Sequence, residues 1–173
     1  MRTLSGVFLC ALSMASFAMP FSPSLAQAGI STNPAPLETT GYSSAVEALS
    51  KYEVDSSQLA LTRSKSQATR AFAQQMVHHH SRVKSDQKIV GRSDTGSALD
   101  APLSQMLDTL QNTPSVEFNA AYKRGQIAAH EEALKVHGAY AAQGSDLAER
   151  AKAQAAMPVI QKHLGAARDL PEA

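Results

Sequence analysis

The chain has 173 residues and a formal net charge of +1, and its single cysteine, Cys10, lies in an apolar stretch near the N-terminus. This charge balance gives no reason to expect nucleic acid or an anionic membrane as a partner. Because the rest of the chain contains no cysteine, neither disulfide bonds nor thiolate metal ligands are expected there.

Residues 1–28 have the pattern of a cleavable signal peptide. Arg2 provides the positive start, residues 7–21 form an apolar run rich in alanine and methionine, and Ala-Gln-Ala at 26–28 is a small-x-small cleavage site. The run is too short and too interrupted by proline to be a stop-transfer helix, and no later run is apolar enough to span a membrane. We therefore expect a periplasmic protein that begins near Gly29 and has no transmembrane segment.

Residues 29–43 are polar, contain two prolines and have no periodicity, which predicts a flexible linker. From residue 44 to 173, alanine, glutamine, lysine, glutamate and leucine dominate, which is typical of a helical domain. The expected long helices span residues 44–64, 67–91, 114–143 and 146–169, with a short helix at 102–111 in the connection between the second and third.

Glycine and proline mark the expected ends of these helices. Gly91 and Gly96 end the second long helix, Thr113-Pro114 predicts an N-cap followed by the first position of the third, and Gly144-Ser145 closes the third and caps the fourth. Short turns favour two antiparallel pairs, which the longer connection joins. The fold class expected is therefore all-α, a ferritin-like four-helix bundle with a short extra helix.

Helical phase indicates which ionisable side chains face the interior. On the first long helix, Glu53 lies in the middle of the apolar stripe that contains Val46, Leu49 and Ala60. On the fourth, His163 lies centrally between Ile160 and Ala167. Buried ionisable groups are costly unless they are paired, hydrogen-bonded or bound to a metal, so these positions are candidates for a site.

The other two long helices contribute histidines. His130 shares a stripe with Gln126, Ala133 and His137 on the third. The second carries the triplet 78–80, in which successive side chains are about 100° apart, so at most two can face inward. Phase places His79 nearest the centre, His80 at the edge and His78 outward, and it leaves open which of His79 and His80 faces the core.

Four segments resemble a known family: YEVDSSQLAL, AFAQQMVHHHSRV, FNAAYKRGQIAAHEEAL and MPVIQKHLGAARDL. They are similar to the domain of unknown function 4142 family of exported bacterial proteins, over about residues 44–170. The resemblance implies a ferritin-like helical bundle and export. It also matches Glu53, His80, His130 and His163 residue by residue, which selects His80 on the second long helix.

The chain departs from the family pattern at two positions. His79 replaces the acid that usually precedes the second-helix histidine, and Asn119 replaces the aspartate that usually follows the third-helix phenylalanine. The first change adds an imidazole, and the second puts a helper role of that aspartate in doubt. His137 is a further addition.

Three imidazoles and one carboxylate suit one divalent transition metal ion, namely zinc, copper, iron or manganese, and Met76 could add a soft ligand for copper. The set lacks the two Glu-x-x-His motifs of a di-iron site. A second interpretation is a structural hydrogen-bond network that fixes the pairing of the helices. Counted from their shared turn, His163 lies about 7 Å deeper than His130, which counts against a common site.

Two functions from different classes follow. The first is a periplasmic protein that binds a metal ion through Glu53, His80, His130 and His163, with His79, Met76 and His137 as additional candidates. The second is a non-enzymatic protein of envelope interaction or stress protection, with an envelope protein as its partner. An enzyme is a third and weaker interpretation, because the sequence identifies no substrate cleft, and nothing in it sets the oligomeric state.

Overall fold

The computed structural model describes residues 37–89 and 99–173, except for the side chains of 82–89. Over this part of the chain there are five α-helices and no β-strand, with one isolated bridge between Leu37 and Gly144. None of the described helices has the length and apolar character to cross a bilayer. The expected signal peptide, residues 29–36 of the linker and the helix stop at 91–96 lie outside the described residues.

Helix α1 (Thr39–Arg63) begins earlier than expected, because residues 39–43 are helical and are not part of a linker. Their composition alone favours a loop, but contacts with the turn between two later helices override it. The backbone N–H of Leu37 donates to the Gln143 carbonyl at 2.8 Å, and that of Ser145 donates to the Leu37 carbonyl at 3.0 Å. The Thr39 hydroxyl lies 2.5 Å from that of Tyr140.

Helix α2 (Gln67–Ile89) follows α1 after a short turn, and its start at Gln67 is as expected. Helix α3 (Ala101–Asn112) confirms the short extra helix. Its N-cap is Asp100, whose Oδ1 accepts a hydrogen bond from the Leu103 N–H at 3.0 Å.

Helix α4 (Phe118–Gln143) starts four residues later than expected, and the assignment of Thr113 as its N-cap is wrong. Thr113 instead ends α3: its hydroxyl donates to the Thr109 carbonyl at 2.7 Å, so it is directed back toward α3. Pro114 lies in the following turn, where its carbonyl accepts from the Glu117 N–H at 3.0 Å.

Helix α5 (Leu147–Arg168) is capped by Asp146 and not, as expected, by Ser145. The Asp146 side chain accepts from the Glu149 N–H at 2.9 Å, which satisfies one of the free N–H groups of the first turn. Gly144 closes α4, as the sequence predicted.

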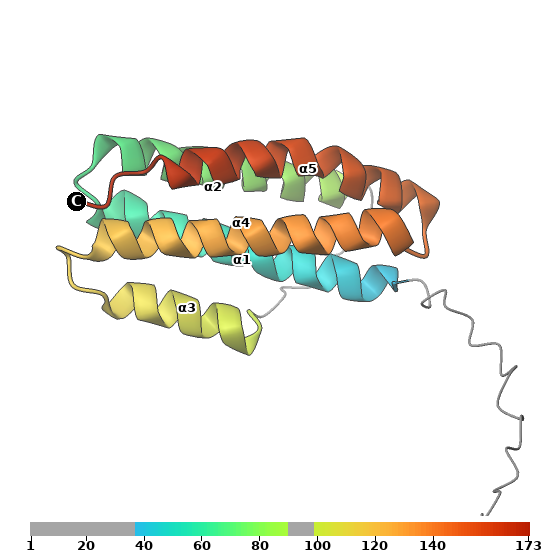
Figure 1. Ribbon diagram of the computed structural model, residues 1–173, viewed down its shortest axis with the longest axis horizontal. Helices are drawn as coiled ribbons and strands as arrows, with labels where there is room; N and C mark the ends of the chain where they lie inside the picture. Colours follow the sequence, from blue (N-terminus) through green and yellow to red (C-terminus); the bar gives the residue numbers. More distant parts are fainter. Residues whose placement is uncertain (1–36, 90–98) are drawn as a thin grey trace, which may run out of the picture. The chain divides into compact units, whose positions relative to one another are not determined.

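The four long helices lie side by side, and α3 lies outside them (Figure 1). Helix α4 packs against α5 and α1, and α1 packs against α2. Helix α3 packs mainly against α1 and, less extensively, against α4, and it buries Leu103, Leu107 and Leu110.

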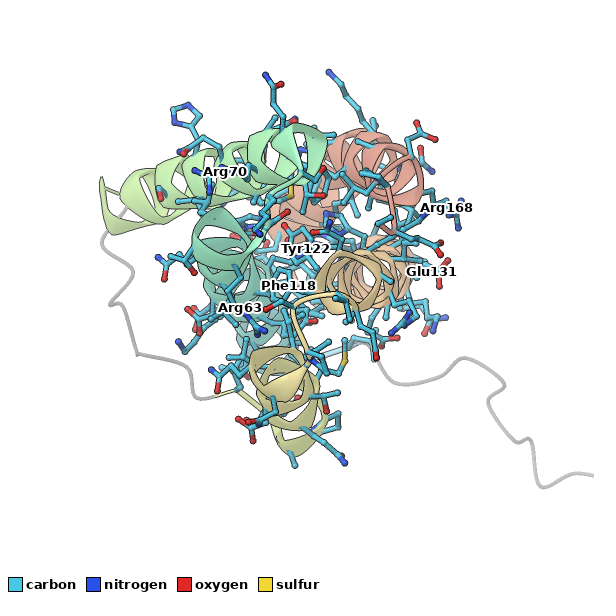
Figure 2. The ribbon with its side chains drawn as sticks, turned by 90° about the vertical axis from the view of Figure 1, so that its left-hand side faces the viewer. Arg63, Arg70, Phe118, Tyr122, Glu131 and Arg168 are labelled. Atoms are coloured by element: carbon cyan, nitrogen blue, oxygen red, sulfur yellow. The ribbon has the colours of Figure 1, made fainter. Side chains whose placement is uncertain are left out.

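Arg63, at the end of α1, fastens the C-terminus of α3. Its guanidinium donates to the Leu110 carbonyl at 2.9 Å and to the Gln111 carbonyl at 2.8 Å. It also lies over the Phe118 ring, 4.5 Å from its centre (Figure 2). One planar cation thus satisfies carbonyls that a helix end leaves free.

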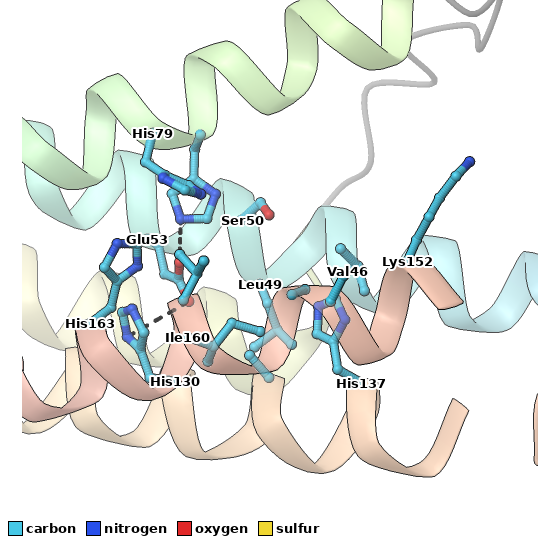
Figure 3. A pocket seen from close by; sticks show the side chains of 15 residues that line it. Val46, Leu49, Ser50, Glu53, His79, His130, His137, Lys152, Ile160 and His163 are labelled. Carbon is cyan, nitrogen blue, oxygen red and sulfur yellow. Dashed lines mark ion pairs between the residues drawn. The ribbon is translucent and has the colours of Figure 1, made fainter. Parts of the chain in front are cut away.

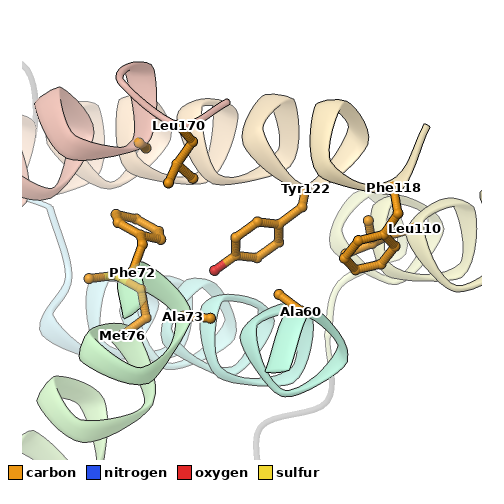
Figure 4. Close-up of a cluster of buried hydrophobic side chains, with 9 residues drawn as sticks. Ala60, Phe72, Ala73, Met76, Leu110, Phe118, Tyr122 and Leu170 are labelled. Carbon is orange, nitrogen blue, oxygen red and sulfur yellow. The ribbon is translucent and has the colours of Figure 1, made fainter. Parts of the chain in front are cut away.

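A hydrophobic cluster fills the end of the domain near the α1–α2 turn (Figure 4). Tyr122 lies within it, with no exposed surface, and its hydroxyl is 2.8 Å from that of Ser57. We call this the Tyr122 cluster; it comprises Ala60, Phe72, Ala73, Met76, Leu110, Phe118, Tyr122, Ala167 and Leu170.

Candidate functional site

A cavity of about 390 Å³ lies between α1, α2, α4 and α5 (Figure 3). Among its lining residues are Glu53 and every histidine of the chain except His78. We call it the histidine cavity; it is lined by Val46, Leu49, Ser50, Glu53, His79, His80, His130, Ala133, His137, Lys152, Ala155, Ala156, Val159, Ile160 and His163.

Glu53 is the acid of this cavity and is only 3% exposed. Its Oε2 lies 2.6 Å from Nε2 of His80, and its Oε1 lies 3.8 Å from Nδ1 of His130. The short contact with His80 has the distance of an ion pair but not the direction of a hydrogen bond. The structure thus confirms that Glu53 lies in the interior and brings three of the predicted residues together.

His130 is held in a defined orientation by its own helix. Its Nδ1 lies 2.8 Å from the carbonyl oxygen of Gln126, one turn earlier on α4. A carbonyl can only accept, so Nδ1 carries the hydrogen and, in the neutral ring, Nε2 presents an unprotonated lone pair. This Nε2 is buried and has no hydrogen-bond partner among the described residues.

His163 joins the same group through ring contacts. Its ring centre lies 5.7 Å from that of His130 and 4.9 Å from that of His79, both nearly perpendicular. The difference in depth expected from the sequence therefore does not keep the two rings apart. His130 is 13 residues before the end of α4 and His163 is 16 after the start of α5, and because the turn residues add no depth, the offset falls to about 4.5 Å.

His79 and His80 both line the cavity, so the residue that helical phase placed nearest the centre and the one that the family resemblance selected lie at the same site. His80 contacts Glu53, and His79 lines the cavity beside His163. His78 is exposed, as predicted.

The carboxylate and the imidazoles affect each other's ionisation. Burial alone would raise the pKa of Glu53, but contact with His80 and the nearby His130 and His163 outweigh burial and lower it. Burial, reinforced by the neighbouring imidazoles, lowers the pKa of His163 to about 4. At neutral pH the cavity therefore contains an ionised Glu53 and an uncharged His163.

His137 lies at the other end of the cavity, where Val46 and Lys152 also line it (Figure 3). Its Nδ1 is 2.9 Å from the hydroxyl of Tyr42, whose ring stacks on Tyr140 with centres 4.0 Å apart. Burial lowers the pKa of His137. Figure 3 shows His137 apart from the group around Glu53, so the structure gives it a separate place.

Two other sequence candidates lie away from the cavity lining. Met76 has no exposed surface and packs in the Tyr122 cluster, so the structure does not place it as a copper ligand. Asn119 accepts a hydrogen bond from the Ser64 hydroxyl at 2.7 Å, at the α1–α2 turn. It therefore joins α4 to the α1–α2 turn, and it is not among the residues that line the cavity.

The described side chains include no group of three or more His, Cys, Asp or Glu residues already placed to hold a metal ion. Glu53, His80 and His130 are close together, but Nδ1 of His130, the atom nearer to Glu53, is the one bonded to the Gln126 carbonyl. These three residues would therefore have to change their side-chain rotamers to bind one metal ion together.

Comparison with known proteins identifies the family. The family model described as "Domain of unknown function (DUF4142)" matches residues 25–170. The chain belongs to this family. No curated protein and no solved structure matches the chain. DUF4142 membership thus confirms the resemblance seen in the four sequence segments.

Sequence reasoning missed two residues of the site. Gln126 was noted only as a neighbour on the His130 stripe, yet its carbonyl fixes the His130 ring, and its side chain donates to the Ser56 hydroxyl at 2.9 Å. The spacing of four residues, one helical turn, between Gln126 and His130 was the signal in the sequence for this contact. Tyr42 was assigned to the linker, and no local pattern indicated its bond to His137.

Proposed function

We propose that this DUF4142 member is an exported periplasmic protein with a ferritin-like four-helix bundle, and that it binds one divalent transition metal ion. The proposed ligands are Glu53, His80, His130 and His163, and the proposed ions are zinc, copper, iron or manganese. The signal-peptide pattern of residues 1–28 supports export. The order and packing of the helices support the bundle.

One observation carries the metal proposal: Nε2 of His130 is a buried, unpartnered acceptor in a cavity that also contains Glu53. A ligating histidine usually donates its other ring N–H to a carbonyl or carboxylate, which sets the tautomer. Gln126 already provides this arrangement for His130. Leaving such an atom unpaired in the interior costs about 1–3 kcal/mol, which a ligand would recover.

The chemistry of the other donors fits the same ions. A carboxylate and neutral imidazoles are ligands for zinc, iron, manganese and copper. His163, whose pKa burial lowers to about 4, is unprotonated at neutral pH and could coordinate. The ionised carboxylate of Glu53 would supply the negative charge of the metal site, so no second acid is needed.

A structural network is the second candidate, and the Glu53–His80 contact of 2.6 Å favours it. In this alternative the carboxylate already has a partner, and the buried polar group fixes how alanine-rich helices pair. The protein would then act through an envelope partner or in stress protection. We assign no catalytic activity.

Calorimetric titration distinguishes these candidates. Zinc, copper, manganese and ferrous iron are titrated separately into metal-stripped protein that was purified without an affinity tag. We expect saturable one-to-one binding of at least one ion. The same ion should raise the unfolding free energy by about 2.7 kcal/mol at a hundred times its dissociation constant, because it binds only the folded chain.

The variants His80→Ala, His130→Ala and His163→Ala should each remove most of this stabilisation. His78→Ala is the matched control, because His78 is on the same helix as His80 but is exposed, and it should leave binding unchanged. Failure of all four ions to bind would favour the structural network. Equal loss in His78→Ala would place any binding at the surface.

A further inference from the structure

The histidine cavity is larger than one metal ion requires. Its volume is about 390 Å³, whereas a water molecule occupies about 30 Å³ in the liquid. Cavities of roughly 300–1,000 Å³ are typical of small-molecule sites. The space beyond the Glu53 group can therefore hold an organic molecule.

Most of this space has an apolar wall. Leu49 and Ile160 lie between the Glu53 end and the His137 end (Figure 3). The other apolar lining residues are Val46, Ala133, Ala155, Ala156 and Val159. An occupant must therefore have an apolar body that replaces water along this wall.

The Glu53 end of the cavity contains two hydrogen-bond acceptors. Nε2 of His130 is unpartnered in a side chain that is 1% exposed, and its Nδ1–H is used by the Gln126 carbonyl. The carboxylate of Glu53 is also an acceptor. An occupant that brings one hydrogen-bond donor to this end pairs the buried nitrogen, whereas one that brings only acceptors leaves it unpaired.

The His137 end of the cavity is also lined by Lys152, whose side chain is 63% exposed, so this end reaches the protein surface. The ammonium of Lys152 lies 2.8 Å from Oε1 of Glu149, so this cation already has an anionic partner. The cavity therefore has a path for entry but no strong selection for an anionic ligand.

We propose that the histidine cavity binds a small neutral molecule with an apolar body and one hydroxyl donor, of the phenol class. The hydroxyl donates to Nε2 of His130 once neighbouring side chains move aside, because this atom is buried in the structure. The body lies against Leu49 and Ile160. This inference does not rest on the proposed metal function. A metal ion would compete for the same nitrogen, so the two are tested separately.

The experiment is calorimetric titration of phenol into chelator-treated protein at neutral pH. We expect saturable one-to-one binding. Anisole has a similar body but no donor, so it leaves Nε2 unpaired and should bind roughly tenfold more weakly. In protein with ¹⁵N-labelled histidine, phenol should shift the Nε2 resonance of His130 and leave that of the exposed His78 unchanged.

Two variants test the location. Ala156→Leu adds side-chain volume to the cavity wall and should weaken phenol binding at least tenfold, whereas Ala151→Leu, at an exposed position of the same helix that does not line the cavity, should not. The proposal is overturned if phenol does not saturate, if anisole binds equally well, or if the His130 resonance does not move. Loss of binding in both variants would also overturn it, since Ala151 is outside the wall. Because a chelator is present throughout, none of these results bears on metal binding.

Discussion

Tyr122 and His130 lie two turns apart on α4, and both are almost completely buried, yet their polar atoms have different surroundings. The Tyr122 hydroxyl pairs with that of Ser57 inside a filled hydrophobic cluster, and burial raises its pKa above the ordinary value. Nε2 of His130 has no partner among the described atoms and belongs to a cavity lining. A paired polar group in a filled region is part of the packing, whereas an unpaired one beside empty space is a candidate for binding.

The unpaired atom is informative only together with the space beside it. Nε2 of His80 also lacks a hydrogen bond, but it lies 2.6 Å from the Glu53 carboxylate. The hydroxyl of Thr69 and the side-chain oxygen of Gln126 lack partners as well within the described structure. Neither residue lines the histidine cavity. His130 meets both conditions, which is why the proposals above depend on it.

The largest expected effect compares side-chain truncations in the two regions. Tyr122→Ala should lower the free energy of unfolding by about 3–5 kcal/mol, because it leaves a void in the Tyr122 cluster and removes the partner of Ser57. Ile160→Ala should cost only about 1–2 kcal/mol, because its side chain is half-buried and borders space that is already empty. Urea unfolding measures both.

Val116→Ala is the control for this comparison, since Val116 is 85% exposed, and it should change stability by less than about 0.5 kcal/mol. Equal losses in Tyr122→Ala and Ile160→Ala would show that the cavity wall is packed as tightly as the cluster. The distinction between the two regions would then be wrong.

The next prediction concerns the charge in the cavity. Glu53→Ala should cost about 1–3 kcal/mol at pH 7, because it leaves His80 without its carboxylate. The pKa of Glu53 is lowered on folding, so its contribution is fully present above about pH 4.5 and is lost as the pH falls through the folded value. The difference between wild type and variant should therefore be constant from pH 7 to about 5 and shrink below that, as urea unfolding across this range would show.

Glu132→Ala is the matched control, because the Glu132 side chain is 54% exposed and pairs with Lys135 in the same helix. It should change stability by less than about 0.5 kcal/mol. If Glu53→Ala and Glu132→Ala unfold alike, Glu53 does not stabilise the interior imidazoles.

The fold was predictable where local patterns decide it. The short extra helix and the starts of α2 and α5 follow from composition and punctuation, to within a residue. The role of Thr113 was not predictable in this way, because threonine before proline suits an N-cap. In the structure a turn at 114–117 separates α3 from α4, and the Thr113 hydroxyl donates to a carbonyl of α3. The start of α1 was missed because contacts with residues 143–145, distant in sequence, decide it.

The site was predictable to a similar degree. Periodicity identified Glu53 and His163 as interior, because one polar residue in an apolar stripe is visible in sequence. It was less decisive for His130, which shares its stripe with Gln126 and His137. It could not rank His79 against His80, since both lie near the boundary of the stripe and the outcome depends on how α2 faces α5. The cavity itself has no signature in sequence, because it results from how four helices fail to fill the space between them.

The smallest expected effect uses two glycines, one beside packed side chains and one in open space. Gly125→Ala on α4 would place a Cβ where the hydroxyl of Tyr52 lies, and Tyr52 is 1% exposed. Displacing such a side chain costs about 1–3 kcal/mol, which exceeds the gain of about 1 kcal/mol in helix propensity. Gly165→Ala on α5 meets no atom within 4 Å and is exposed, so it should stabilise the protein by about 0.5–1 kcal/mol. Thermal unfolding at neutral pH should therefore move in opposite directions for the same substitution, and a higher melting temperature for Gly125→Ala would show that the packing around Tyr52 can relax as readily as an open surface.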